Sequence, residues 1–201
     1  MDIPTNSHKK ADTEYPVHEI IKQRWSPRSF SEQEVRSETL KQLFDAARWA
    51  PSSFNEQPWR FIYARRQDPE GYGKLVQCMG EYNQKWASEA PVLILTVVKE
   101  NFSKNNKPNR VAEYDVGAAM SYFTFEATRH NLYVHQMAGV KLDRARKIFD
   151  IPKGYKPWTM AAVGYKGDPD DIPEDFEDAE KKKRSRKEID EIAFKGSWQK
   201  N

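Results

Sequence analysis

The spacing of apolar and polar residues along the chain predicts helices that alternate with a few short strands. One helix is predicted to begin at Ser37, a residue type favoured at N-caps, and to end before Pro51. Its apolar residues recur at the spacing of a single helix face: Leu40, Leu43, Phe44 and Ala47. A shorter helix is predicted from Val17 to Arg24, because Ser26 precedes Pro27 and the residue before a proline disfavours helical backbone.

Four segments have the composition of strands. The continuous apolar run from Val92 to Val98 is typical of a strand that is buried on both faces. The other three segments contain more polar residues: Trp59–Ala64, Leu132–Met137 and Trp158–Val163. Two more helices are predicted between the strands, at Glu70–Gly80 and Leu142–Phe149. Helices interleaved with strands indicate a layered fold of mixed α and β elements.

The longest predicted helix runs from Arg110 to Arg129, after a polar loop at Asn101 to Asn109. Apolar residues occupy nearly every side of this helix, which is the pattern of a buried helix. Its small-residue cluster, Gly117 to Ala119, would let another backbone approach closely, such as that of a second subunit. The sequence therefore predicts a central helix that takes part in extensive packing.

Composition indicates a folded protein with charged ends. The mean hydropathy is low, at −0.91, but six Trp, nine Tyr and ten Phe can bury a large apolar area. We expect one domain over residues 1–201, with a flexible terminus at residues 1–15 and a charged C-terminal segment at residues 168–201. Within that segment, residues 168–180 carry eight acidic and no basic residues, and residues 181–187 carry six basic and no acidic residues.

Several classes of chemistry lack the residues that they need. Cys78 is the only cysteine, which excludes an intramolecular disulfide and favours a reducing, cytoplasmic location. The sequence contains no HExxH, GxSxG, P-loop or GxGxxG motif, and we expect no metal site. No apolar run approaches the ~20 residues that cross a bilayer, so no membrane partner is expected.

The basic run at residues 181–187 leaves two interpretations open. It is compatible with a nucleic-acid patch or a localisation signal, although a solvated tail that offsets the acidic run is favoured. The formal net charge of +3 is too small to imply a polyanionic partner by itself. We therefore do not expect nucleic acid as a partner on this ground.

Two polar segments contain the residue types of a ligand site. The first has two guanidinium groups and a hydroxyl, which suit a phosphate or a polyol: Arg24, Trp25, Ser26, Pro27 and Arg28. The second places hydroxyls and amides between two prolines, after a helix and before a strand: Pro51, Ser52, Ser53, Phe54, Asn55, Glu56, Gln57 and Pro58. A plain loop and a polar lining for a planar heterocycle both explain this second segment.

With these two segments and three others in the same order, the chain resembles the nitroreductase family of FMN-dependent, NAD(P)H-oxidising enzymes. The resemblance covers roughly residues 17–186. It implies that the segment at 24–28 binds the phosphate and ribityl chain, and that the segment at 51–57 meets the flavin of the partner subunit. The other segments would place an asparagine at the flavin edge, backbone along its face and a basic pair on the phosphate: Asn83, then Gln136, Met137, Ala138 and Gly139, then Arg184 and Arg186.

The resemblance implies an α+β fold, a three-layer sandwich whose central, mostly antiparallel sheet is flanked by helices. It also implies an intertwined homodimer with FMN at the subunit interface. The implied activity is ping-pong two-electron reduction of a small-molecule acceptor, such as a nitroaromatic or a quinone, with NADH or NADPH as the electron donor. No side chain is expected to act as a nucleophile, because the flavin supplies the chemistry. Arg28 is expected to stabilise the negative charge of the reduced flavin.

The chain also departs from the family pattern. Trp86 stands where some relatives carry a lysine, and Ala138 stands where some carry a glutamate. The acidic stretch at residues 168–180 follows no family pattern. The alternatives are a dehalogenating or flavin-fragmenting branch of the same superfamily and, in another class, a nucleic-acid-binding protein that uses residues 181–187.

Overall fold

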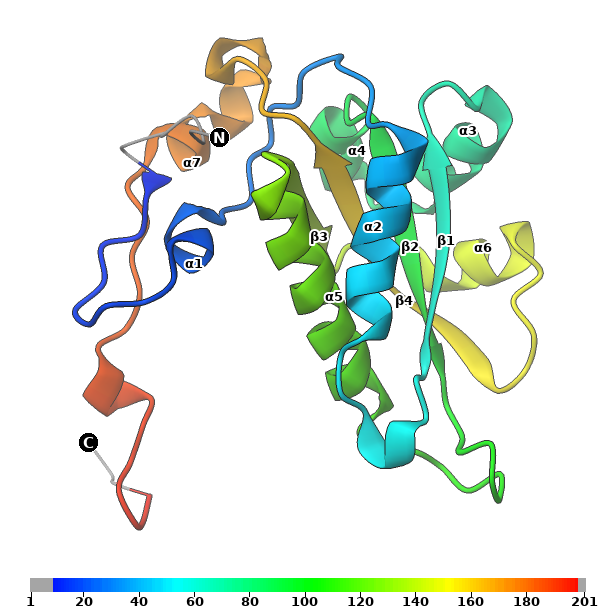
Figure 1. The fold of residues 1–201 in the computed structure, drawn as a ribbon. Coiled ribbons are helices and arrows are strands. Elements are labelled where there is room, and N and C mark those ends of the chain that lie inside the picture. The colour runs from blue at the N-terminus through cyan, green and yellow to red at the C-terminus, as the bar shows by residue number, and fades with distance from the viewer. Residues whose placement is uncertain (1–8, 199–201) are drawn as a thin grey trace.

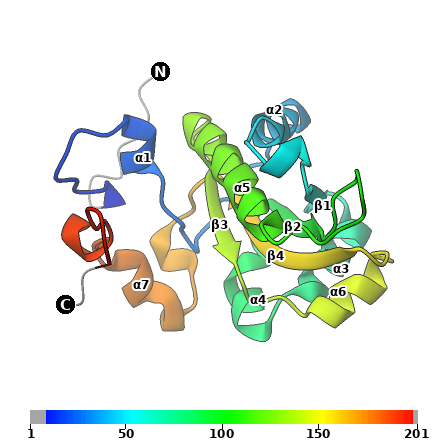
Figure 2. The same ribbon diagram turned by 90° about the horizontal axis from the view of Figure 1, so that it is seen from below.

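The computed structural model describes residues 9–198 and has a four-stranded sheet between two layers of helices (Figures 1 and 2). The strands lie in the order β1 (Trp59–Arg65), β2 (Val92–Lys99), β4 (Tyr155–Gly164) and β3 (Tyr133–Met137). Every neighbouring pair is antiparallel. The predicted α+β class and antiparallel sheet are therefore confirmed, and β4 begins three residues earlier than predicted.

Helices α2 (Ser37–Arg48) and α5 (Ala112–Arg129) cover one face of the sheet. The predicted apolar face of α2 is confirmed, because Leu40, Leu43 and Ala47 are buried there. Ser37, however, is the first helical residue and not the N-cap, a position that Arg36 occupies without a side-chain hydrogen bond. The prediction of a serine cap was wrong because composition alone does not fix the backbone angle at which a helix starts.

The opposite face is covered by α3 (Pro69–Cys78), α4 (Glu81–Ala87) and α6 (Leu142–Ile148). Cys78 is fully buried in this second core. Strand β2 serves both cores, because Ile94 belongs to the cluster under α2 and α5 whereas Leu93 and Leu95 belong to the other. The prediction that this strand is buried on both faces is confirmed.

Helix α5 is not buried all round in the single chain. Tyr114 is 80% exposed, and Tyr122 and Phe125 on the same side are 43% and 37% exposed. The prediction of a fully buried helix was therefore wrong for one chain, since the apolar stripe extends past the surface that the sheet and α2 cover. Among residues 9–198, no helix is both long and apolar enough to span a membrane.

The two ends of the described chain lie side by side, outside the sheet next to β3 (Figures 1 and 2). The N-terminal part carries α1 (Glu19–Gln23), and the C-terminal part carries the 3₁₀ turns η3 (Pro169–Asp171), η4 (Glu174–Phe176) and η5 (Ile189–Glu191) with α7 (Glu177–Lys181). Lys9 joins them, because its Nζ donates to the carbonyl of Lys182 at 2.6 Å. Residues 1–8 of the predicted flexible terminus lie outside the described residues.

Candidate functional site

Cationic side chains from both ends of the chain line one cavity of about 430 Å³. Arg24 follows α1, whereas Arg184 and Arg186 lie beyond α7. The other polar lining residues are Lys9, Ser26, Lys182, Lys183 and Ser185. Among the described residues, no carboxylate lines this cavity. Guanidinium, ammonium and hydroxyl groups without an acid form a site that is suited to an anion.

The arginines of this cavity repel one another and are partly withdrawn from water. Burial lowers the pKa of Arg24, and the nearby charge of Arg186 lowers it further. Burial also lowers the pKa of Arg184 to about 10, with contributions from both other arginines. Arg184 stays in place because its Nη1 donates to the carbonyls of Lys9 and Lys22, at 3.0 and 2.9 Å. A bound anion would offset this repulsion.

A smaller cavity of about 240 Å³ adjoins the first, since Arg24 and Ser26 line both. Arg24 Nη1 donates to Ser26 Oγ at 3.3 Å, which holds the shared wall together. The remaining walls come from α5 and β3: Ser121, Thr124, Phe125, Val134 and Gln136. Six predicted site residues therefore meet around two adjoining cavities: Arg24, Trp25, Ser26, Gln136, Arg184 and Arg186.

The residues that follow Gln136 at the end of β3 lie next to the start of α4 in space. Asn83, on α4, places its Nδ2 3.5 Å from the carbonyl oxygen of Gly139. A Cβ at Gly139 would lie only 2.7 Å from that nitrogen, so a side chain there would displace Asn83. Met137 points into the core, whereas Gln136, Ala138 and Gly139 are exposed. The structure thus brings Asn83 and the predicted 136–139 segment together.

The loop between α2 and β1 has an uncommon backbone. Phe54, Asn55 and Gln57 have φ angles of 52°, 56° and 52°, in the left-handed region that residues other than glycine seldom adopt. The loop closes on itself, because Ser52 Oγ accepts the backbone N–H of Gln57 at 3.0 Å. Phe54 is 92% exposed. Strained backbone in an exposed loop is an observation that points to function rather than to stability.

Glu56 anchors this loop to the neighbouring hairpin. Its carboxylate accepts from Lys99 Nζ at 2.6 Å and from Ser103 N and Oγ at 2.9 and 2.7 Å. Burial alone would raise the pKa of Glu56, but these hydrogen bonds hold it at about 2. The other anchor is on α5, where Asp115 Oδ2 accepts the backbone N–H of Ser53 at 3.1 Å.

The loop does not reach the cationic cavity of the same chain. Asp115 lies in the first turn of α5, whereas the first residue of α5 that lines the smaller cavity is Ser121, six residues further on. That separation is about 9 Å along a helix. Figures 1 and 2 show the α2–β1 loop and α1 on opposite sides of α5. The second predicted segment is therefore apart from the first: Pro51, Ser52, Ser53, Asn55 and Gln57.

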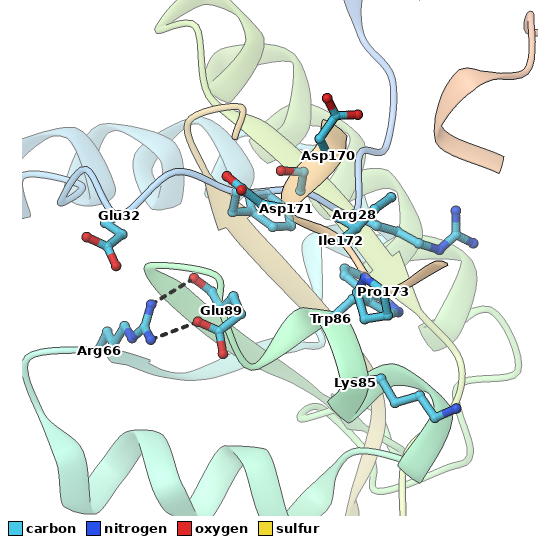
Figure 3. A pocket seen from close by; sticks show the side chains of 12 residues that line it. Arg28, Glu32, Arg66, Lys85, Trp86, Glu89, Asp170, Asp171, Ile172 and Pro173 are labelled. Carbon is cyan, nitrogen blue, oxygen red and sulfur yellow. Dashed lines mark hydrogen bonds and ion pairs between the residues drawn. The ribbon is translucent and has the colours of Figure 1, made fainter. Parts of the chain in front are cut away.

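Arg28 lines a third cavity, of about 600 Å³, and neither of the two that Arg24 lines (Figure 3). The walls of this cavity carry both charges, including an Arg66–Glu89 ion pair at 2.8 Å. In Figure 3 the Arg28 side chain points away from that pair. Trp86 forms part of the lining. The two arginines of the first motif therefore have different surroundings.

Tyr133 and His135, both on β3, support the first motif. Trp25, a predicted site residue, is 6% exposed and packs edge-on against Tyr133, with ring centroids 6.0 Å apart. His135 Nδ1 donates to the carbonyl of Pro27 at 2.8 Å. Burial lowers the pKa of His135 to about 4, so the ring is neutral at pH 7. Sequence reasoning missed His135 and Lys9, because an isolated His or Lys has no spacing to recognise.

Comparisons with known proteins assign the chain to a family. The family model described as the nitroreductase family matches residues 21–77 and 68–165. A crystal structure described as that of an oxidoreductase containing FMN is 34% identical, covers 98% of this chain and 100% of its own, and has a TM-score of 0.90. A nitroreductase family protein from Clostridium difficile 630 shares the fold at 24% identity, with 89% and 97% of the two chains covered and a TM-score of 0.69.

A curated relative matches part of the chain. An uncharacterized 15.4 kDa protein of Mycolicibacterium smegmatis is 32% identical over 113 residues, which are 56% of this chain and 75% of that protein. The fold and the family match agree. The chain belongs to the nitroreductase family and is an oxidoreductase of that family. The resemblance stated from the motifs is confirmed.

Proposed function

We propose that this protein binds FMN and uses NADH or NADPH for the ping-pong, two-electron reduction of a small acceptor such as a nitroaromatic or a quinone. The cationic cavity without a carboxylate is the observation that carries the proposal. Arg24, Arg184 and Arg186 would hold the phosphate, and Ser26 would add a hydroxyl hydrogen bond. The similar structure that is 34% identical is described as containing FMN, which supports the choice of cofactor.

The surface next to the phosphate cavity has the chemistry of a flavin site. Gln136 and the hydroxyls of Ser121 and Thr124 suit the ribityl chain, and the exposed backbone at Ala138 and Gly139 suits a flat ring. When bound, FMN would accept a hydride from the nicotinamide and deliver it to the acceptor. The protein would bind the ring, orient it and exclude water. The charge of Arg28 would favour the reduced state.

We propose that the site is completed in a homodimer, with FMN at the subunit interface. The α2–β1 loop is about 9 Å along α5 from the smaller cavity of its own chain. Its Ser52, Ser53, Asn55 and Gln57 would instead contact the flavin of the partner. The exposed stripe of α5, made by Tyr114, Tyr122 and Phe125, would be covered in the same interface. An obligate interface of this kind buries ~2,000 Å² or more.

The basic run at residues 181–187 has a place in this proposal. Five of its residues line the cavity together with Arg24: Lys182, Lys183, Arg184, Ser185 and Arg186. This arrangement supports a role in cofactor binding over a free tail that would contact nucleic acid. A cytoplasmic location, where NADH and NADPH are supplied, completes the proposal.

Spectroscopy of the purified protein tests the proposed function. Protein purified without added cofactor should show flavin absorbance, or should bind FMN in a fluorescence titration and reject FAD. Addition of NADH or NADPH under anaerobic conditions should bleach the bound flavin, and a quinone should restore its colour. A protein that binds no FMN would overturn the proposal, and one that binds FMN but is not bleached by either nucleotide would overturn the choice of electron donor.

A further inference from the structure

The guanidinium group of Arg28 lies between two aromatic rings. Its Cζ is 5.8 Å from the ring centroid of Trp86 and 5.7 Å from that of Phe176. Trp86 is 2% exposed on α4, and Phe176 is fully buried at the end of η4. Attraction between a cation and an aromatic face is stronger where water is excluded. Two rings from elements 90 residues apart therefore fix the direction of one side chain.

The same C-terminal segment also holds the backbone of Arg28. Glu180 is 2% exposed, and its Oε2 accepts the backbone N–H of Arg28 at 3.1 Å. The position of Glu180 is fixed in turn by Lys9, whose Nζ donates to the carbonyls of Ala179 and Lys182 at 3.3 and 2.6 Å. Residues 176–180 thus restrain Arg28 at its backbone and at its guanidinium group.

These restraints leave the guanidinium of Arg28 without a salt bridge. Within the described residues, no carboxylate lies within ion-pair distance of it, and Nε is buried without a hydrogen-bond partner. The buried Glu180 carboxylate interacts with this charge electrostatically but does not pair with the guanidinium. A carboxylate would position the group equally well but would neutralise its field, whereas an aromatic ring positions a cation and leaves its charge uncompensated. An aromatic clamp is therefore suited to an arginine that must act on a charge elsewhere.

We infer that Phe176 and Trp86 are positioning residues that hold the guanidinium of Arg28 toward the reduced flavin, and that this is the role of the acidic C-terminal stretch. The inference rests on the proposed function. It accounts for two departures from the family pattern, the tryptophan at position 86 and the stretch at 168–180. The acidic residues around Phe176 keep the segment in solvent while its one large apolar ring inserts beside α4.

The first test needs no cofactor. In protein without FMN, the NMR resonance of the Arg28 Nε–H, assigned by its loss in Arg28→Gln, should be displaced by the ring currents of the clamp. Phe176→Leu should move this resonance toward the position of a free arginine, and Phe176→Tyr should not. Tyr82→Leu is the matched control, because Tyr82 packs edge-on against Phe176 at 4.9 Å and makes no cation–π contact with Arg28. An Arg28 resonance that Phe176→Leu leaves unchanged would overturn the clamp.

The second test uses protein loaded with FMN. Phe176→Leu should slow reduction of the flavin by NADH or NADPH about tenfold and lower its two-electron potential by about 30 mV, the equivalent of tenfold in the equilibrium. Phe176→Met serves the same purpose if the leucine variant does not fold, because methionine conserves more of the volume. Phe176→Tyr should stay within about twofold of the parent, and so should Tyr82→Leu.

A double-mutant cycle separates positioning from general stability. In an Arg28→Gln background, Phe176→Leu should have no further effect on the potential, because the group that it positions is already gone. Equal shifts in both backgrounds would show that Phe176 acts without Arg28 and would overturn the inference. A parent protein that fails to bind FMN would overturn the proposed function instead, and the cofactor-free measurement would still decide whether the clamp exists.

Discussion

Replacement of Arg186 by alanine tests the phosphate cavity with little structural damage. The side chain is exposed, and the hydrogen bond that the structure gives it is to the adjacent carbonyl of Ser185, at 2.7 Å. One charge-assisted hydrogen bond contributes about 1.5–3 kcal/mol, so FMN affinity should fall roughly 10- to 150-fold. Riboflavin, which lacks the phosphate, should bind nearly as before. The double variant Arg184→Ala/Arg186→Ala should lose roughly two to four powers of ten in FMN affinity.

The stability of the cofactor-free protein should not fall together with the FMN affinity. The charge of Arg186 lowers the pKa of both Arg24 and Arg184, which means that the three groups repel one another before an anion binds. Removal of Arg186 should therefore leave the Tm of the apoprotein unchanged or slightly higher. This combination, weaker FMN binding without loss of stability, distinguishes a ligand site from a structural cluster.

Fluorescence titration with FMN and riboflavin measures both affinities, and a thermal melt without cofactor measures stability. Lys187→Ala is the matched control, because Lys187 belongs to the same basic run but does not line the cavity. Equal losses of FMN and riboflavin affinity would refute the reasoning, as would a loss in Lys187→Ala as large as in Arg186→Ala.

Three further predictions concern catalysis, assembly and acid stability. Stopped-flow reduction at saturating FMN should be about 30- to 200-fold slower in Arg28→Gln, a loss of ~2–3 kcal/mol in transition-state stabilisation. The rate should be nearly unchanged in Arg24→Gln, which should only bind FMN more weakly. Equal rates for Arg28→Gln and the parent would contradict the electrostatic role. Sedimentation should show a dimer for the parent and a weakened dimer for Tyr114→Lys, and a flavin-loaded parent monomer would rule the dimer out. Because the folded pKa of Glu56 is about 2, below its ordinary 4.5, its carboxylate stabilises the fold above pH 4.5 and loses that contribution as the pH falls toward 2. The free energy of unfolding should therefore fall less steeply between pH 5 and 2 in Glu56→Gln, and parallel acid titrations of the two proteins would contradict this.

Local pattern was sufficient wherever the apolar residues of an element by themselves show how it is buried. The apolar spacing of α2 and the continuous apolar run of β2 each identify an element whose packing needs no knowledge of distant residues. Helix α4 was not predicted, because its own residues show no such pattern. Its seven residues include only two that are buried, Trp86 and Ala87, and fewer than two turns show no period. Packing against the rest of the fold, and not local pattern, makes this segment helical.

The types of residue in the candidate site were also readable from the sequence. Arginines and a serine at 24–28, amides and hydroxyls at 51–57 and a late basic pair suffice to indicate an anion and a polar heterocycle. The sequence did not show how these residues are divided between the cavities. That Arg24 and Arg28 line different cavities depends on the rings of Trp86 and Phe176, which no spacing in the sequence connects.

The sequence by itself thus determined the elements with strong periods, the chemistry of the motifs and the family. Only the tertiary structure decided which motifs share a cavity, how far the α2–β1 loop lies from it, and which side chains hold Arg28. The physical reason is that hydrophobic spacing and residue type are local properties, whereas a cavity is made by chain segments that meet only after the sheet and both helical layers have packed. Lys9 and Lys182 illustrate this, because their 2.6 Å hydrogen bond joins residues 173 positions apart.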